Sequence, residues 1–265
     1  MWGLLKVVLG FMAIGLEIVG HLPLAPLFWL GRMLGRGAAV DAVMARVVRA
    51  WGRRCLKYLQ CRVEVDGLGQ VPRSGPVILM ANHQSLLDIP VCLGFLGRTM
   101  GFVAKRELFR IPGLSLWMRE LHCASIDRAD VRASGALLEA FSRKVRAGGY
   151  CLLIFPEGTR TRHPGGELGP FRRGALRLAQ AEGIPVVPVS LDGTRFLVKL
   201  KTLSRIPPER RVVRVRIAPL VPVPRHLSAP AAKRLMESLR ETIVSNWRAV
   251  RIDWTQPVQP ETRNR

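Results

Sequence analysis

The stretch 77–88 constrains the fold of this chain more than any other. Residues 77–80 form an apolar run of strand length, and the apolar-rich segment after Asn82 and His83 can open a helix. His83 therefore stands where a strand gives way to a helix. Positions five apart on a helix are rotated by about 140°. His83 and Asp88 can thus meet only if His83 lies in the preceding turn and Asp88 in the first turns of the helix.

A contact between these two side chains has a chemical consequence. A carboxylate on one imidazole nitrogen fixes the tautomer and leaves the other nitrogen free to accept a proton. The pair would then be a general base with no protein nucleophile beside it. The residues also fit a purely structural role, because Ser85 and Asp88 have the spacing of a helix capping box. A histidine near a helix start can simply be a satisfied polar residue.

Segments of strand character alternate with helical segments from residue 61 onward. Strands are expected at 62–66, 77–80, 101–105, 150–155, 185–190 and 213–217, and helices at 129–147 and after the capping residue Ser228. This order predicts an α/β domain over residues 61–250, built as a mixed sheet covered by helices. A flexible polar tail is expected at 251–265.

Two further stretches place charged residues where strands end. Residues 155–160 leave an apolar strand and turn at Gly158, and such a glycine followed by Arg160 can form a phosphate cradle. Lys105 and Arg106 again put cations at the end of a strand. Ligands of α/β sheets lie outside the carboxyl ends of the strands. The alternative is an ordinary turn with solvated arginines. No cysteine or histidine spacing indicates a metal site.

The first 36 residues are apolar but interrupted. Lys6 and Glu17 flank one apolar run, and two prolines break the next. A spanning helix needs roughly 20 apolar residues, which neither run supplies without Glu17. Two short helices dipping into one leaflet are the favoured interpretation, and one spanning helix containing Glu17 is the alternative. Residues 37–60 have the pattern of a basic amphipathic helix, which is typical of an anionic lipid surface.

The charge of the chain points to a polyanionic partner. The formal net charge is +22 and the pI is about 11.4, which favours either nucleic acid or an anionic membrane. Nucleic acid is the weaker of the two, because only 6% of residues are aromatic and no nucleic-acid-binding motif is present. The five cysteines are scattered among apolar segments, as expected of reduced thiols in a cytosol-facing protein.

Four blocks of sequence occur in a specific order. They are NHxxxxD at 82–88, the block from FVAK to proline at 102–112, FPEGTR at 155–160 and IPVVPV at 184–189. In this order they resemble the glycerolipid acyltransferase family with the HxxxxD motif, the family of the lysophosphatidic acid acyltransferases. The resemblance covers about residues 60–220. It implies an α/β domain preceded by an N-terminal membrane-associated helical region, in agreement with the pattern of residues 1–36.

The resemblance also implies a reaction. A fatty acyl group would move from acyl-CoA or acyl-ACP, the acyl carrier protein thioester, to the sn-2 hydroxyl of lysophosphatidic acid, giving phosphatidic acid. His83, held by Asp88, would be the catalytic base. The substrate-binding residues would be Lys105, Arg106, Glu157, Gly158, Thr159 and Arg160. Arg160 and Lys105 would hold the phosphate. Neither a bound cofactor nor a metal is implied, because the thioester is a co-substrate.

The implied partners are a membrane surface with anionic lipid, lysophosphatidic acid and acyl carrier protein, with no nucleic acid. The implied location is the inner (cytoplasmic) membrane, with the active site facing the cytosol. Within the family, the alternative acceptor is another lyso-lipid, such as a lyso-ornithine lipid or another lysophospholipid. A thioester or lipid hydrolase usually needs a Ser or Cys nucleophile, and the chain has no G-x-S-x-G motif. A non-enzymatic membrane protein is a third alternative, which the intact His83 and Asp88 disfavour.

Overall fold

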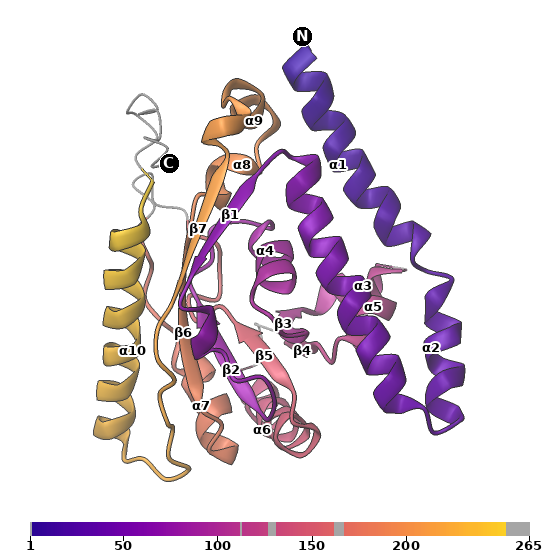
Figure 1. Cartoon of the computed structure of the whole chain (residues 1–265). Helices are drawn as coiled ribbons and strands as arrows, with labels where there is room; N and C mark the ends of the chain where they lie inside the picture. Colours follow the sequence, from indigo (N-terminus) through magenta and orange to yellow (C-terminus); the bar gives the residue numbers. More distant parts are fainter. Residues whose placement is uncertain (1, 112, 127–130, 162–166, 253–265) are drawn as a thin grey trace.

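The chain is described by a computed structural model over residues 2–111, 113–126, 131–161 and 167–252 (Figure 1). Within these residues a seven-stranded sheet forms the centre, with the strand order β1-β7-β6-β2-β5-β3-β4. The strands are β1 Arg62–Asp66, β2 Val77–Ala81, β3 Met100–Lys105, β4 Ala124–Ile126, β5 Cys151–Ile154, β6 Val186–Asp192 and β7 Val212–Ile217. The flexible tail expected at 251–265 lies, from residue 253 on, outside the described residues.

The sheet is mixed, as the sequence predicts. β6, β2, β5, β3 and β4 run parallel, β7 is antiparallel to β6, and β1 is parallel to β7. We call the edge where β2, β3, β5 and β6 end the carboxyl edge, and the edge where they begin the amino edge. β1 and β7 therefore end at the amino edge. β4 is the strand that the sequence pattern did not predict, because three residues are too short to show a period.

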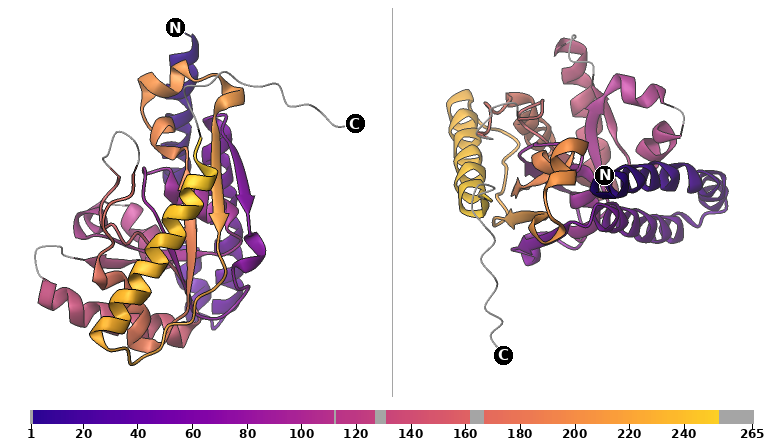
Figure 2. Two further views of the ribbon diagram at one scale, coloured as in Figure 1. Left: turned by 90° about the vertical axis from the view of Figure 1, so that its left-hand side faces the viewer. Right: turned by 90° about the horizontal axis from the view of Figure 1, so that it is seen from above.

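Helices cover both faces of this sheet (Figures 1 and 2). Leu79 of β2 packs with α3 and α4 on one face, whereas its neighbours Ile78 and Met80 pack with α7 and α10 on the other. The helices are α1 Trp2–Gly20, α2 Leu24–Met33, α3 Gly37–Tyr58, α4 Asp88–Phe95, α5 Leu114–Glu120, α6 Val131–Gly148, α7 Arg173–Glu182, α8 Thr194–Leu197, α9 Leu200–Arg205 and α10 Ala229–Val250, with the short 3₁₀ helices η1 Leu68–Gln70, η2 Arg106–Arg110 and η3 Pro208–Arg210.

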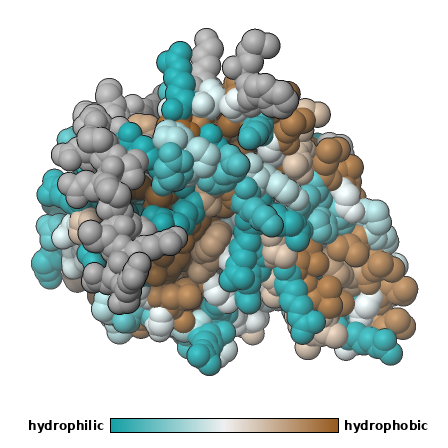
Figure 3. Space-filling model, turned by 45° about the horizontal axis from the view of Figure 1, so that its top comes forward, coloured by the Kyte–Doolittle hydropathy of each residue, from teal (hydrophilic) through white to brown (hydrophobic). Residues whose placement is uncertain are grey.

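The N-terminal region forms two helices that join at a turn. α1 and α2 are separated at residues 21–23, so the break expected between two apolar segments is present. Many of their apolar side chains face solvent, namely Leu4, Leu5, Leu9, Met12, Leu16, Val19, Leu27, Trp29, Leu30 and Met33. Figure 3 shows brown side chains gathered on the right, the side that α1 and α2 occupy in Figure 1. Among the described residues, Gly3–Met33 is the one helical stretch long and apolar enough to cross a membrane, by length and composition alone.

An ion pair fastens α1 to α3. Glu17 accepts hydrogen bonds from Arg54 Nε at 2.7 Å and from the Tyr58 hydroxyl. Its side chain is only 16% exposed, so the one acidic residue of the N-terminal helices is neutralised within the protein. α3, which corresponds to the amphipathic helix expected at 37–60, is thereby held against α1 on one side and against the domain on the other.

Two glycines bring the backbones of α3 and α4 into direct contact. A methyl group added at Gly52 would lie 2.6 Å from the Pro90 carbonyl oxygen and 2.7 Å from the Gly94 nitrogen. A methyl group at Gly94 would likewise lie 2.9 Å from the Gly52 carbonyl carbon. Because all of these neighbours are backbone atoms, no side-chain rotation could relieve the overlap. The crossing fixes where α4 begins relative to the sheet.

We expect Gly52→Ala to destabilise the fold by about 2 kcal/mol or more, since overpacking at this crossing forces the helices apart. Thermal unfolding measures the effect. Gly37→Ala, in the same helix but with no neighbouring atom within 4 Å, is the control and should leave the melting temperature unchanged or slightly higher. Equal melting temperatures for the two variants would contradict the close crossing.

Candidate active site

The centre of the site is the contact between His83 and Asp88. The strand β2 ends at Ala81, and Asp88 is the first residue of α4, so His83 lies in the connecting turn. His83 Nδ1 lies 2.7 Å from Asp88 Oδ2. The ring also stacks on Phe155 at a centroid distance of 4.0 Å and an interplanar angle of 15°. The contact that the sequence predicts is therefore present, and the ring is held in one plane with Nε2 left to meet a ligand.

The Asp88 carboxylate is completely buried and accepts four hydrogen bonds. Oδ2 accepts from His83 Nδ1 and from the backbone N–H groups of Gln84 at 2.7 Å and Ser85 at 2.9 Å. Oδ1 accepts from the Thr194 hydroxyl. α4 begins at Asp88 with Leu87 as its N-cap and no side-chain bond to the cap, so Ser85 and Asp88 do not form the capping box that their spacing also fits. The Asp88 carboxylate instead closes the turn before the helix and orients the imidazole.

Two amide side chains tie this turn to β6. Asn82 donates to the Leu191 carbonyl at 2.9 Å and accepts from the Leu191 N–H at 2.8 Å. Gln84 donates to Asp192 at 2.7 Å and accepts from the Gly193 N–H at 3.1 Å. Both amides are buried. The turn that carries His83 is thus anchored on either side of the ring by bonds to the end of one neighbouring strand.

Glu157 links the turn to the other neighbouring strand, β5. Its carboxylate is 4% exposed. Oε1 accepts from the His83 N–H at 2.9 Å, and Oε2 accepts from the Gly169 N–H at 2.9 Å and the Thr161 hydroxyl at 3.1 Å. The Thr161 N–H returns a bond to the His83 carbonyl at 2.7 Å. The contacts found for Glu157 are made with the chain itself, and its substrate-binding role stays a prediction.

The turn after β5 presents Thr159 and Arg160 to solvent. Gly158 has a φ of +66°, in the left-handed region that favours glycine. A methyl group there would also lie 2.8 Å from Arg172 Nε. Thr159 and Arg160 are both exposed, and among the described residues no carboxylate forms an ion pair with Arg160. The turn therefore offers one guanidinium beside the His83 backbone.

Lys105 and Arg106 stand farther out on the same edge. Lys105 is the exposed last residue of β3, and Arg106 begins η2. β5 lies between β3 and β2 in the sheet, so these cations are two strands from His83. The structure joins His83, Asp88 and Glu157 by direct bonds, places Gly158, Thr159 and Arg160 in the adjoining turn, and shows no bond from Lys105 or Arg106 to His83.

The sequence did not single out Thr194, the residue that holds the second oxygen of Asp88. Thr194 follows β6 and begins the one-turn helix α8, and it is completely buried. A threonine after a strand is too common to signal such a role. Gln84 lies inside the NHxxxxD motif, at one of the positions for which the motif specifies no residue. Both residues act through Asp88, because both donate hydrogen bonds that fix its carboxylate or the turn around it.

The cysteines are not available as thiolate nucleophiles. Cys92 follows Asp88 by one helical turn, and burial, with Asp88 nearby, raises the pKa of its thiol well above the ordinary value. Burial raises the pKa of Cys151 to about 12. Among the described residues, no serine or cysteine is hydrogen-bonded to the His83 ring, and no group of three His, Cys, Asp or Glu side chains could hold a metal ion. Within the described residues, the His83–Asp88 pair therefore stands without a serine or cysteine nucleophile bonded to it.

An apolar cavity of about 100 Å³ lies between the N-terminal helices and the domain. Ile89 and Leu93 of α4 form one wall, next to Asp88. The other lining residues come from α1, α3, β3 and α5, and are Ile18, His21, Val47, Val48, Trp51, Phe102, Leu114, Trp117, Met118 and Leu121. An apolar chain is the kind of ligand that such a lining fits.

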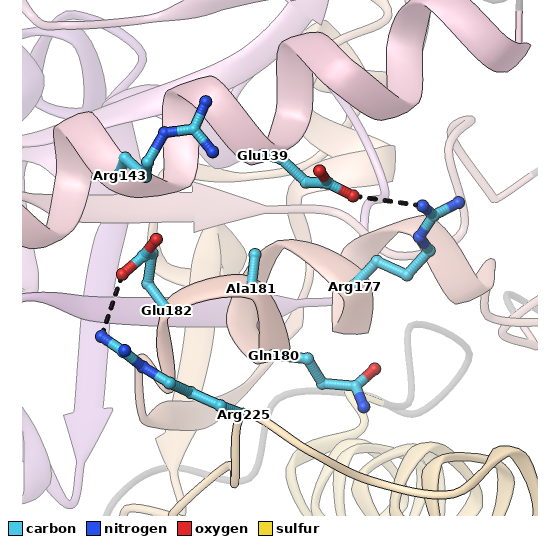
Figure 4. Close-up of a pocket in the computed structure, with 7 residues that line it drawn as sticks. All are labelled: Glu139, Arg143, Arg177, Gln180, Ala181, Glu182 and Arg225. Carbon is cyan, nitrogen blue, oxygen red and sulfur yellow. Dashed lines mark hydrogen bonds and ion pairs between the residues drawn. The ribbon is translucent and has the colours of Figure 1, made fainter.

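A second pocket, of about 260 Å³, lies between α6 and α7 at the amino edge (Figure 4). Arg177 pairs with Glu139 at 3.4 Å, and Arg225 pairs with Glu182 at 3.0 Å. The dashed lines in Figure 4 mark these pairs. Because two of its cations are already neutralised and it faces away from the edge that carries His83, this pocket takes no part in the site.

The family model described as Acyltransferase matches residues 62–192. The chloroplastic 1-acyl-sn-glycerol-3-phosphate acyltransferase BAT2 of Brassica napus is 37% identical over 134 residues, which are 50% of this chain and 38% of that protein. The 1-acyl-sn-glycerol-3-phosphate acyltransferase of Borreliella burgdorferi is 29% identical over 205 residues, 76% of this chain and 79% of that protein. The chain thus spans less than two fifths of the plant protein but most of the bacterial one.

A solved structure shares the fold. The crystal structure of the 1-acyl-sn-glycerophosphate acyltransferase PlsC from Thermotoga maritima aligns with a TM-score of 0.68 and 28% sequence identity, covering 92% of this chain and 98% of that chain.

We expect Glu157→Gln to lower the free energy of unfolding by about 1–3 kcal/mol, because the new amide places a donor opposite an N–H donor or loses one acceptor. Chemical denaturation measures the change. Glu139→Gln, at a side chain that is 50% exposed, is the matched control and should change stability by less than about 0.5 kcal/mol. Equal effects would contradict the three bonds assigned to Glu157.

Proposed function

Because the chain belongs to the acyltransferase family, we propose that it transfers a fatty acyl group to the sn-2 hydroxyl of lysophosphatidic acid and produces phosphatidic acid. The names of its relatives support this acceptor. The observation that carries the proposal is the arrangement of His83, whose Nδ1 is held by a buried carboxylate while Nε2 is left for a ligand. No nucleophile of the chain is bonded to this ring among the described residues, so the acceptor must supply one.

The proposed reaction is a direct transfer. His83 Nε2 takes the proton of the acceptor hydroxyl as its oxygen attacks the carbonyl carbon of the acyl thioester. Collapse of the tetrahedral intermediate forms the ester and breaks the carbon–sulfur bond, and the imidazolium returns the proton to the leaving thiolate. Asp88 stabilises the imidazolium and fixes the tautomer. The negative oxygen of the tetrahedral intermediate also needs hydrogen-bond donors. The backbone N–H groups of Gln84 and Ser85 already donate to Asp88. Our candidate donors are therefore groups of Thr159 and Arg160 in the exposed turn.

The phosphate of the acceptor is assigned to the exposed cations. Arg160 lies in the turn joined to the His83 backbone, and a guanidinium can bind two phosphate oxygens at once. Lys105 is the second proposed phosphate ligand, and Arg106 a helper. We assign Gly158 and Thr159 to the wall of the acceptor site, and Glu157 to the positioning of that wall, since its carboxylate is buried and bonded within the chain.

The acyl chain and its carrier complete the proposal. The apolar cavity beside α4 is the proposed space for an acyl chain, because its lining is almost entirely apolar. The donor is proposed to be acyl-CoA or acyl-ACP, and both are anionic partners that suit a chain with a net charge of +22. Assays with each thioester separately, across a panel of lyso-lipids with mass spectrometry of the products, identify donor and acceptor.

The proposed location is the cytoplasmic face of the inner membrane. The apolar side chains that α1 and α2 expose support binding to a leaflet. The cations of α3, which follows directly, support contact with anionic lipid on the cytosolic side. A membrane-bound enzyme whose acceptor is a lipid would then meet that acceptor at the surface and its soluble donor from the cytosol.

We expect His83→Ala to lower kcat about 10²–10⁴-fold, the usual contribution of a general base. Asp88→Asn should also lower kcat strongly, because the amide cannot orient and stabilise the imidazolium as the carboxylate does. Steady-state rates with lysophosphatidic acid and an acyl thioester measure both. His226→Ala, at an exposed histidine on a loop, is the control. Full turnover by either active-site variant, folded normally, would refute the base.

We expect Arg160→Ala to lower kcat/KM for lysophosphatidic acid by about 10- to 100-fold, the loss of one charge-assisted hydrogen bond. The matching measurement uses 1-monoacylglycerol, which lacks the phosphate, and Arg160→Ala should barely change its rate. Arg146→Ala, at an exposed position of α6, is the control for net charge. If both acceptors lose the same factor, Arg160 does not bind the phosphate.

A further inference from the structure

Exposed apolar side chains gather at one edge of the α/β domain. Outside α1–α3 and the turn between them, the large apolar residues that the described chain leaves exposed are Leu68, Leu86, Leu108, Ile111, Leu116, Leu200 and Leu220. Most of them lie in segments that follow β2, β3 or β6, and so at the carboxyl edge. Only Leu68 and Leu220 follow β1 and β7, which end at the amino edge. The bias places apolar surface on the edge that carries His83.

Four of these residues lie in the segments after β2 and β3, and we call them the rim: Leu86, Leu108, Ile111 and Leu116. Leu86 is the clearest case. It lies between Ser85 and Leu87, which are 1% and 5% exposed, yet its own side chain is 62% exposed. The turn that holds the reactive imidazole therefore projects one leucine outward while it buries its neighbours. Ile111 and Leu116, on either side of the turn into α5, are 47% and 44% exposed.

The segment that carries most of the rim is fixed to the N-terminal helices. Trp117 of α5 makes edge-on ring contacts with His21 and Phe28, at centroid distances of 6.2 Å and 6.3 Å. Glu120 pairs with Arg32 of α2 at 3.2 Å. These contacts hold α5, and with it the rim residue Leu116, against the α1–α2 pair. A membrane surface that binds α1 and α2 would therefore also meet the rim residue carried by α5.

Cations alternate with the rim residues. Arg110 is exposed directly before Ile111, and Arg119 is exposed one turn after Leu116. Lys105, also exposed, precedes η2. Apolar side chains interleaved with basic ones are typical of segments that lie at the headgroup level of an anionic leaflet. Exposed apolar side chains continue from the rim into α1 and α2. A membrane surface explains this extent, whereas a soluble protein partner would not need it.

We propose that the rim is a second membrane-contact surface, which enters the same leaflet as α1 and α2 and holds the carboxyl edge, with His83, at headgroup level. The N-terminal helices then anchor the protein, and the rim sets its orientation. The purpose of the surface rests on the proposed function, since a lipid acceptor must reach His83 from the leaflet, but its binding to lipid can be measured without any reaction.

The test compares rim variants with a control of matched exposure in the full-length chain. The rim variants are Ile111→Glu and Leu116→Glu. The control is Leu68→Glu, at a leucine that is 45% exposed on the amino edge. Flotation with vesicles of phosphatidylcholine and phosphatidylglycerol in equal parts gives the partition coefficient. Each rim variant should partition about tenfold more weakly than the unmodified chain, and the control should partition like the unmodified chain.

A second measurement separates docking from catalysis. The rate is measured with a long-chain acceptor embedded in the vesicles and with a short-chain, water-soluble acceptor in their absence. The rim variants should lose the vesicle rate and keep the soluble rate. Unchanged flotation of the rim variants, or equal loss in the control, would overturn the proposal. Loss of both rates would assign the rim to substrate binding instead, and a lower oligomeric state of the rim variants than of the unmodified chain would assign it to contact between copies of the chain.

These outcomes are distinct from failure of the proposed function. If the unmodified chain transfers no acyl group to any acceptor, the function fails, whereas the flotation comparison still decides whether the rim binds lipid.

Discussion

The structure depends on one buried carboxylate. Asp88 has no exposed surface, and no lysine or arginine of the described chain pairs with it, so its charge is balanced by hydrogen bonds from two backbone N–H groups, one hydroxyl and one imidazole. A charge buried in this way is costly unless each lone pair is used. The same four bonds therefore close the turn after β2, hold the first residue of α4 and orient His83. Loss of any one of these bonds would leave a lone pair of the buried carboxylate without a donor. A substitution at this position therefore affects the stability of the fold and the orientation of His83 together.

The turn around His83 is a bridge between strands rather than a free loop. Asn82 and Gln84 bind the end of β6, while the Glu157 carboxylate and the Thr161 N–H bind the His83 backbone from the side of β5. The parallel arrangement of β6, β2 and β5 brings these three strand ends to one edge. A polar motif in a turn would ordinarily be solvated and adaptable. Here Asn82 and Gln84 are buried, and the geometry of the turn is set by hydrogen bonds to backbone and side-chain atoms at the ends of the neighbouring strands.

Much of this arrangement could be predicted from the sequence, and the omissions have physical reasons. The apolar run before His83 and the five-residue spacing to Asp88 identify a strand, a turn and a helix start, because each has a period or a cap. The alternation of segments predicts the mixed α/β sheet. Thr194 could not be found, since its role depends on α8 folding back against α4, which no local pattern encodes. Glu157 was expected to face a ligand, but a glutamate in a turn gives no indication of whether its carboxylate points to solvent or inward to a backbone N–H.

The contact between Gly52 and Gly94 has a mechanical consequence. Packed helices can slide past one another by small shear movements at their side-chain interface. At this crossing the two backbones touch, and no side-chain layer separates them. The Glu17–Arg54 ion pair also joins α3 to α1. Direct contacts therefore connect α1 through α3 to α4. If α1 binds a leaflet as proposed, a tilt of α1 would be passed through α3 to α4, the helix whose first residue is Asp88.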